Sequence, residues 1–155
     1  MSAHSNREIE RKFLIKRLPA DLKRFRHYKI AQGYLVTEPD DRHVRLRKVG
    51  RNASLTFKLV RRHIRDEREI KLTQKQFATL WPGTVGRRLQ KTRYEIPWKK
   101  FLIEIDVYGG KNKGLVVAEV EFRNRAACRK FKPPSWFGRE VTGVKRYSNI
   151  QLGIE

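Results

Sequence analysis

The chain has 155 residues and carries 37 lysines and arginines against 16 aspartates and glutamates, a formal net charge of +21. Its length allows one domain with a buried core, and a hydrophobic content of 39% excludes a disordered chain. A single cysteine, Cys128, excludes an internal disulfide and a cysteine metal site, and no apolar run is long enough to span a membrane. We therefore expect one soluble, cytoplasmic domain covering 1–155.

The N-terminal half of the chain alternates charged and apolar residues with the two-residue period of a β-strand. The first such segment covers 8–15. Glu8, Glu10 and Lys12 share one of its faces, and apolar residues share the other. A proline near the first turn predicts a short helix over 18–27. We expect four further strands, joined by short turns, at 28–38, 43–49, 54–61 and 64–72.

The C-terminal half is expected to begin with a helix and to continue with three strands. Thr73 is the expected N-cap of a helix over 74–80, and Pro82 ends it. Strands follow at 88–98, 101–108 and 114–122, and the last thirty residues are expected to be helical or irregular. Eight strands at this spacing favour an antiparallel barrel or sandwich, with the helices covering its apolar outer faces.

The predicted strands collect acids and bases on faces of one kind. The acids are Glu8, Glu10, Glu67, Glu69, Glu104, Asp106, Glu119 and Glu121, and the bases are Lys12, Arg45, Arg47, Lys58, Arg65, Lys91 and Arg93. Carboxylate oxygens suit Mg²⁺ or Mn²⁺, and guanidinium and ammonium groups suit phosphate. A site with both features suits phosphoryl transfer, in which an aligned water attacks a phosphate. The structural alternative is a surface sheet with many salt bridges.

Sequence motifs along nearly the whole chain carry a family resemblance. They include Glu8-Ile-Glu10-Arg-Lys12, Gln32-Gly33-Tyr34-Leu35, Val44-Arg45-Leu46-Arg47, Thr56-Phe57-Lys58, Arg65-Asp66-Glu67-Arg68-Glu69, Lys91-Thr92-Arg93-Tyr94, Glu104-Ile105-Asp106, Glu119-Val120-Glu121 and Gly138-Arg139-Glu140-Val141-Thr142. The first of these has the form ExExK. With these motifs the chain resembles the CYTH superfamily of triphosphate tunnel metalloenzymes, above all its short bacterial members. The resemblance implies an α+β fold built on a closed eight-stranded antiparallel β-barrel, a tunnel, with a few covering helices.

The resemblance also implies roles for the charged residues. The implied metal ligands are Glu8, Glu10, Glu119 and Glu121, with Glu67, Glu69 and Asp106 as further candidates. The implied phosphate contacts are Lys12, Arg45, Arg47, Lys58, Lys91 and Arg93. One tunnel lysine, either Lys12 or Lys91, is expected to help activate the attacking water, because neighbouring cations lower the pKa of a lysine. The sequence does not choose between the two lysines.

The function that the resemblance implies is hydrolysis of inorganic tripolyphosphate with Mg²⁺ or Mn²⁺. One alternative is action on an organic triphosphate, as a thiamine triphosphatase, a nucleoside triphosphatase or a class IV adenylate cyclase. Such substrates need a pocket for an organic base, and the sequence shows no dedicated aromatic cluster for one. A second alternative is a non-catalytic binder of polyphosphate or nucleic acid, which would use the basic surface. We expect a monomer or homodimer without a membrane partner.

One position departs from the family pattern. Val144 stands near the C-terminus where the resemblance leads us to expect an aspartate. We expect this change to alter metal occupancy or the docking of the C-terminal segment, and not to abolish activity.

Overall fold

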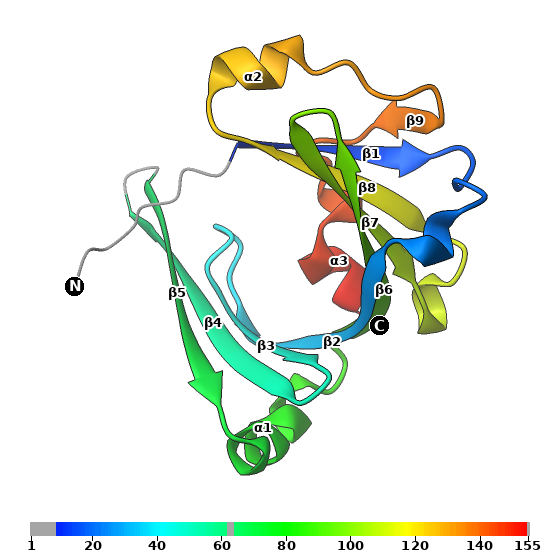
Figure 1. Ribbon diagram of the computed structural model, residues 1–155. Coiled ribbons are helices and arrows are strands. Elements are labelled where there is room, and N and C mark those ends of the chain that lie inside the picture. The colour runs from blue at the N-terminus through cyan, green and yellow to red at the C-terminus, as the bar shows by residue number, and fades with distance from the viewer. Residues whose placement is uncertain (1–8, 62–63, 155) are drawn as a thin grey trace. The chain divides into compact units, whose positions relative to one another are not determined.

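Strands make up most of the structure, a computed structural model that describes residues 9–61 and 64–154, without the side chains of 60, 61, 64 and 65 (Figure 1). Within these residues the strands are β1 (Ile9–Ile15), β2 (Arg26–Thr37), β3 (His43–Val49), β4 (Asn52–Arg61), β5 (Ile64–Leu72), β6 (Arg88–Trp98), β7 (Phe101–Tyr108), β8 (Val116–Phe122) and β9 (Phe137–Glu140). The strands are mostly antiparallel, in the order β5-β4-β3-β2-β6-β7-β8-β1-β9. This order has two ends, so closure into a barrel stays a prediction.

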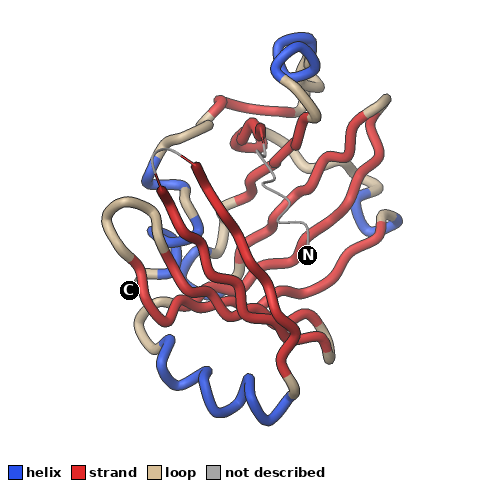
Figure 2. Tube along the Cα trace, turned by 90° about the vertical axis from the view of Figure 1, so that its left-hand side faces the viewer, coloured by secondary structure: helices blue, strands red, loops and turns tan. Residues whose placement is uncertain are grey.

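The helices are short, as the blue segments of Figure 2 show. They are α1 (Gln74–Leu80), α2 (Arg125–Lys130) and α3 (Asn149–Gly153), with 3-10 turns η1 (Leu22–Arg24), η2 (Trp81–Thr84), η3 (Gly110–Asn112) and η4 (Lys145–Tyr147). Among the described residues, none of these helices has the length and apolar character that a bilayer span requires. The predicted site residues among those described all lie on strands.

The described residues form two compact units. The first unit contains 30–61, 64–89 and 149–154, and the second contains 9–29 and 90–148. Two of the boundaries fall within strands β2 and β6, and a third lies between η4 and α3. The expectation of a single domain over 1–155 stays a prediction.

The first unit contains β3, β4, β5 and most of β2, and α1 covers its apolar core. Leu46, Ala53 and Phe77 are buried together in this core. A capping box starts α1, because the Thr73 side chain accepts from Gln76 N and the Gln76 side chain accepts from Thr73 N. Since Phe77 follows this cap by one turn, the cap places the helix residue that enters the core.

The second unit has an aromatic core beneath β1, β7 and β8. The Phe13 ring centroid lies 5.0 Å from that of Phe137 and 6.2 Å from that of Phe131. Arg11, on the same strand as Phe13, donates to the backbone carbonyls of Cys128 and Phe131. Together these contacts join β1 to α2 and to the segment that follows it.

Most of the predicted elements are confirmed, several of them with identical bounds. The predicted helix over 18–27 is wrong, because only the single turn η1 forms and β2 already begins at Arg26. The count of eight strands is also wrong, since the last thirty residues contain β9. This four-residue strand pairs Phe137 with Ile15 of β1, and Phe-Gly-Arg-Glu is too short for an alternating pattern to show.

Candidate functional site

In the second unit, strand pairing brings acids and bases into one row. Glu104 lies opposite Glu95 on β6 and opposite Glu119 on β8, and Glu119 lies opposite Lys12 on β1. Directly opposed residues of antiparallel strands point to the same face. The row Glu95-Glu104-Glu119-Lys12 therefore forms one charged face, in which Glu104, Glu119 and Lys12 were predicted to share a face and Glu95 was not.

The buried centre of this face is a triad of Lys91, Asp106 and Arg93. Lys91 Nζ lies 2.8 Å from Asp106 Oδ2, and Arg93 donates through Nε and Nη2 to the two Asp106 oxygens at 2.8 and 2.9 Å. The Lys91 side chain is 0% exposed and that of Asp106 1%. Arg93 also lies 2.7 Å from Glu104 Oε2 through Nη1. Each charge that the fold buries here thus has an opposite charge beside it.

Burial shifts the pKa values of this triad. Removal of water lowers the pKa of Lys91 to about 8, although Asp106 partly opposes this shift. Burial by itself would raise the pKa of the Asp106 carboxyl, but Lys91 and Arg93 outweigh it and bring the pKa to about 2. Burial also raises the pKa of Glu104, against the effect of Arg93. Lys91 therefore exchanges its proton much closer to neutral pH than an ordinary lysine.

Lys12 is held through its side-chain ammonium group and through its backbone N. Its Nζ lies 3.2 Å from Glu119 Oε1 and donates to the Tyr147 carbonyl at 3.2 Å. Its backbone N donates to Thr142 Oγ1 at 3.0 Å. Val144 is 44% exposed and precedes η4 without a side-chain cap. The C-terminal segment that contains Val144 thus helps to orient Lys12.

Two predicted metal ligands lie at the outer end of the second unit's charged face. Glu10 and Glu121 face each other across β1 and β8, and both are exposed. Glu121 and Glu104 line a hollow of about 290 Å³ together with Leu102, Phe122 and Arg123. Glu8 lies outside the described residues. This end of the face offers carboxylate oxygens to solvent.

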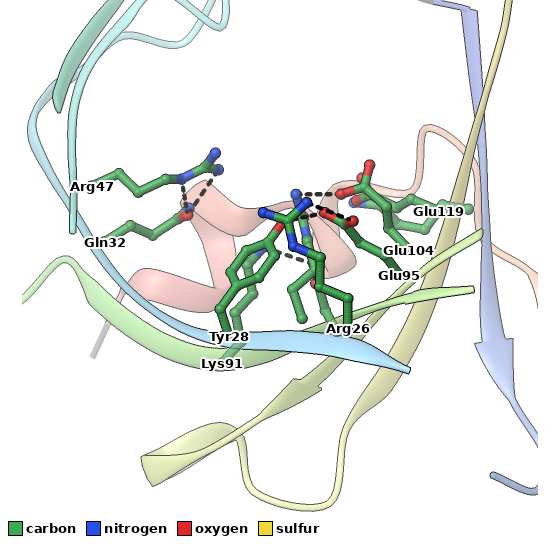
Figure 3. Close-up of polar contacts among 11 residues, drawn as sticks. Arg26, Tyr28, Gln32, Arg47, Lys91, Glu95, Glu104 and Glu119 are labelled. Atoms are coloured by element: carbon green, nitrogen blue, oxygen red, sulfur yellow. Dashed lines mark hydrogen bonds and ion pairs between the residues drawn. The ribbon is translucent and has the colours of Figure 1, made fainter. Parts of the chain in front are cut away.

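The predicted cations of the first unit also share one face. In the strand register, Arg45 lies opposite Tyr34 on β2 and Thr56 on β4, and Arg47 lies opposite Gln32 on β2. Arg47 donates through Nε and Nη2 to Gln32 Oε1 at 3.2 and 3.1 Å, as Figure 3 shows. These contacts place both arginines beside neutral polar groups.

The remaining predicted residues of the first unit continue that face. Lys58 lies opposite Glu67 and donates to Asp41 Oδ2 at 2.9 Å. Glu69 lies opposite Thr56, and both Glu67 and Glu69 are exposed. The side chain of Arg65 lies outside the described residues. The pairing thus aligns the exposed acids of β5 with the cations of β3 and β4.

Several polar residues of these faces were missed at the sequence level. Tyr28 donates to Glu95 Oε1 at 2.8 Å and Arg26 lies 3.5 Å from Glu95 Oε2, a cluster drawn in Figure 3. Gln32 and Tyr34 are the missed residues of the first unit. The signal that could have found them is parity, because Tyr28, Gln32 and Tyr34 occupy alternate positions of one strand.

Known proteins resemble this chain over nearly its whole length. An inorganic triphosphatase from Nitrosomonas europaea is 42% identical over 149 residues, which cover 95% of this chain and 97% of the relative. The crystal structure of an inorganic triphosphatase matches with a TM-score of 0.75 and 41% identity, over 96% of this chain and 95% of that one. No family model matches the chain. The chain belongs to the CYTH family of triphosphate tunnel metalloenzymes.

The resemblance of the motifs to CYTH proteins is thereby confirmed. A more distant solved structure, a protein from Pyrococcus horikoshii, shares the fold at a TM-score of 0.55 and 20% identity, over 79% of this chain and 84% of that one. The roles of individual residues in this CYTH protein stay predictions.

The carboxylates of this CYTH protein fit a hard divalent cation by their chemistry. Within the described residues, no three or more histidine, cysteine, aspartate or glutamate side chains are grouped to hold a metal. Mg²⁺ is commonly bound through one or two carboxylates together with substrate phosphates, so a preassembled cage is not required. Glu10 and Glu121 fit this pattern. Asp106 fits it less well, because Lys91 and Arg93 already contact its oxygens.

Proposed function

We propose that the chain is a divalent-metal-dependent hydrolase of inorganic tripolyphosphate. The observation that carries this proposal is the 42% identity, across 95% of the chain, to an inorganic triphosphatase. The charged faces support it, because they combine carboxylates with phosphate-binding cations. The closed tunnel of the family is part of the proposal and rests on family membership.

The proposed phosphate contacts are Lys12, Arg45, Arg47, Lys58, Lys91 and Arg93, and the proposed ligands of Mg²⁺ or Mn²⁺ are Glu8, Glu10, Glu67, Glu69, Glu119 and Glu121. A bound divalent cation would offset phosphate charge and favour attack by water. For Asp106 the contacts favour a different role from metal ligation. Its carboxylate anchors Lys91 and Arg93 inside the face.

Lys91 is the better of the two lysines for accepting a proton. Its pKa of about 8 leaves a substantial neutral fraction in mildly alkaline solution. A neutral Lys91 Nζ can take a proton from the water that attacks the phosphate. Lys12, fixed by Glu119 and the Tyr147 carbonyl, is then assigned to orienting a phosphate oxygen. The proton thus moves from water to Nζ as the new P–O bond forms and the phosphoanhydride bond breaks.

A substrate panel tests the proposal. Tripolyphosphate, ATP and thiamine triphosphate are each incubated with Mg²⁺, with Mn²⁺ and with a chelator, and the products are identified. We expect phosphate release from tripolyphosphate, strict dependence on metal, and loss of activity in Glu10→Ala and Lys12→Ala. Pyrophosphate release from ATP would indicate a cyclase instead. Metal-independent binding of RNA without turnover would indicate a binding protein.

Three further expectations stay predictions alongside this proposal. They are a cytoplasmic location, a monomeric or homodimeric state, and contact of the basic surface with nucleic acid or polyphosphate.

A further inference from the structure

A buried hydrogen-bonded chain of neutral groups lies behind Arg47 in the first unit. Gln32 is 0% exposed and Tyr34 2%. The Gln32 amide oxygen accepts two hydrogen bonds from Arg47, and its Nε2 donates to Tyr34 Oη at 3.2 Å. Both ends of the amide therefore have a partner, which fixes its orientation. The guanidinium plane of Arg47 is fixed in turn, because two of its N–H groups converge on one oxygen.

The backbone around Gln32 leaves this chain little freedom to move. A Cβ at Gly33 would lie 2.7 Å from the Thr84 Cβ, so β2 packs directly on the end of η2. The Tyr34 ring meets the His43 ring edge-on, with centroids 5.4 Å apart. A side chain enclosed in this way holds its hydrogen bonds in one geometry.

The side chain of Gln32 carries no charge, and this affects the charge around Arg47. A carboxylate in its place would make stronger, charge-assisted hydrogen bonds to Arg47. It would also add a negative charge beside a side chain assigned to an anionic substrate. The amide orients the guanidinium and adds no charge of its own. Arg93, by contrast, is oriented by the carboxylates of Asp106 and Glu104.

Arg45, two residues along the same strand, supports the same interpretation. It contacts Thr56 Oγ1 at 3.4 Å, again a neutral oxygen. Its Nε is buried and has no hydrogen-bond partner among the described residues. A buried N–H of this kind calls for an acceptor, and a phosphate oxygen of the substrate would supply one.

We propose that Gln32 and Tyr34 are positioning residues, which hold Arg47 ready for a substrate phosphate without neutralising it. This inference rests on the proposed function, since the anion is taken to be tripolyphosphate. It assigns Gln32 a role that depends on its being uncharged, and this distinguishes it from a residue that only stabilises the fold.

The test is the substitution Gln32→Glu. For wild type and variant, KM and kcat for tripolyphosphate with Mg²⁺, the Kd for tripolyphosphate by calorimetry, and the Tm are measured. We expect KM and Kd to rise by about tenfold or more, because a charge-assisted pair now competes with the substrate. We expect kcat to change by less than about threefold and Tm to stay or rise. A purely structural Gln32 predicts unchanged KM and Kd, which would overturn the inference.

Two further variants complete the design. Gln76→Glu places the same charge elsewhere in the first unit, at a capping-box position where glutamate serves equally well, and should leave KM within about twofold. Tyr34→Phe removes only the hydroxyl and should raise KM about threefold with little change in kcat. An equal rise in KM for Gln76→Glu would show that an added negative charge anywhere on this unit weakens substrate binding. That result would contradict the inference.

The binding measurement separates this inference from the proposed function. If the wild type binds tripolyphosphate without hydrolysing it, the proposed function fails and the Kd values still decide the role of Gln32. If the wild type neither binds nor hydrolyses it, both proposals fall.

Discussion

On the predicted charged faces, the two units hold their arginines with different kinds of partner. In the second unit Arg93 lies between two carboxylates, those of Asp106 and Glu104. In the first unit Arg45 and Arg47 hydrogen-bond to the neutral oxygens of Thr56 and Gln32. A carboxylate partner compensates much of the charge of a guanidinium, whereas a neutral hydrogen-bond partner adds no compensating charge. Arginines of one protein can thus serve as internal counter-ions or as receptors, depending on their partners.

The largest effect should follow from breaking the compensated cluster with Asp106→Ala. Lys91 and Arg93 would be left buried without their shared carboxylate, so the free energy of unfolding should fall by about 3–5 kcal/mol. Urea unfolding measures this loss. Glu104→Gln is the matched control, because Glu104 is less buried, and its loss should be smaller. If the free energy of unfolding of Asp106→Ala fell by less than about 1 kcal/mol, Asp106 would not be the group that compensates the buried charges of Lys91 and Arg93.

The pH dependence of kcat should show the effect of burial on Lys91. With a pKa of about 8, Lys91 gains its proton as the pH falls, so kcat should drop about tenfold per pH unit below 8. Above pH 8 the profile should level. Steady-state rates with tripolyphosphate from pH 6 to 10 measure this profile. Lys91→Arg, which cannot lose its proton in this range, should reduce kcat and flatten the curve. If kcat of the wild type were already independent of pH from pH 6 upward, Lys91 would not be the general base.

A change in the first unit should weaken substrate binding and have little effect on stability. Arg45→Gln removes a cation whose identified partner is neutral, so KM should rise about tenfold and the free energy of unfolding should change by less than about 1 kcal/mol. Kinetics and urea unfolding on the same samples measure both. If stability fell as far as in Asp106→Ala, the two units would not differ in the way proposed.

The smallest effect is expected at Val144. Val144→Asp places a carboxylate at the N-cap of η4, where it would accept from backbone N–H groups and stabilise the turn by about 0.5–1 kcal/mol. The turn already holds Lys12 through the Tyr147 carbonyl, so kcat should stay within about twofold. Thermal unfolding and steady-state kinetics measure the two effects. A change in kcat of tenfold or more would give Val144 a larger role than exposure suggests.

The strands could be predicted from sequence because local patterns determine them. The predicted bounds of β3, β6, β7 and α1 agree with the structure. The alternation of charged and apolar residues predicted the strands, and the capping residues predicted α1. β9 escaped prediction because its existence depends on the edge of β1, which is more than a hundred residues away in the chain. The prediction of a helix over 18–27 was wrong because its last residues form the beginning of β2.

The candidate site was predicted less completely, since alternation identifies a face and not a neighbour. It placed Lys91, Arg93 and Asp106 among the functional residues, but only the structure shows that Lys91 and Arg93 both contact Asp106. The assignment of Asp106 to a metal stays a prediction, and its contacts with Lys91 and Arg93 favour an anchoring role instead. Gln32 and Glu95 were passed over because parity places a polar residue on a face and does not identify its partner.

The hydrogen bond between Lys12 and the Tyr147 carbonyl joins residues 135 positions apart. During synthesis the N-terminal strand therefore leaves the ribosome long before its partners β8 and β9 exist. Contacts so distant in the chain close late in folding. The nascent enzyme should accordingly be inactive until Tyr147 has been synthesised, and a product terminated before that residue should lack the ability to turn over triphosphate.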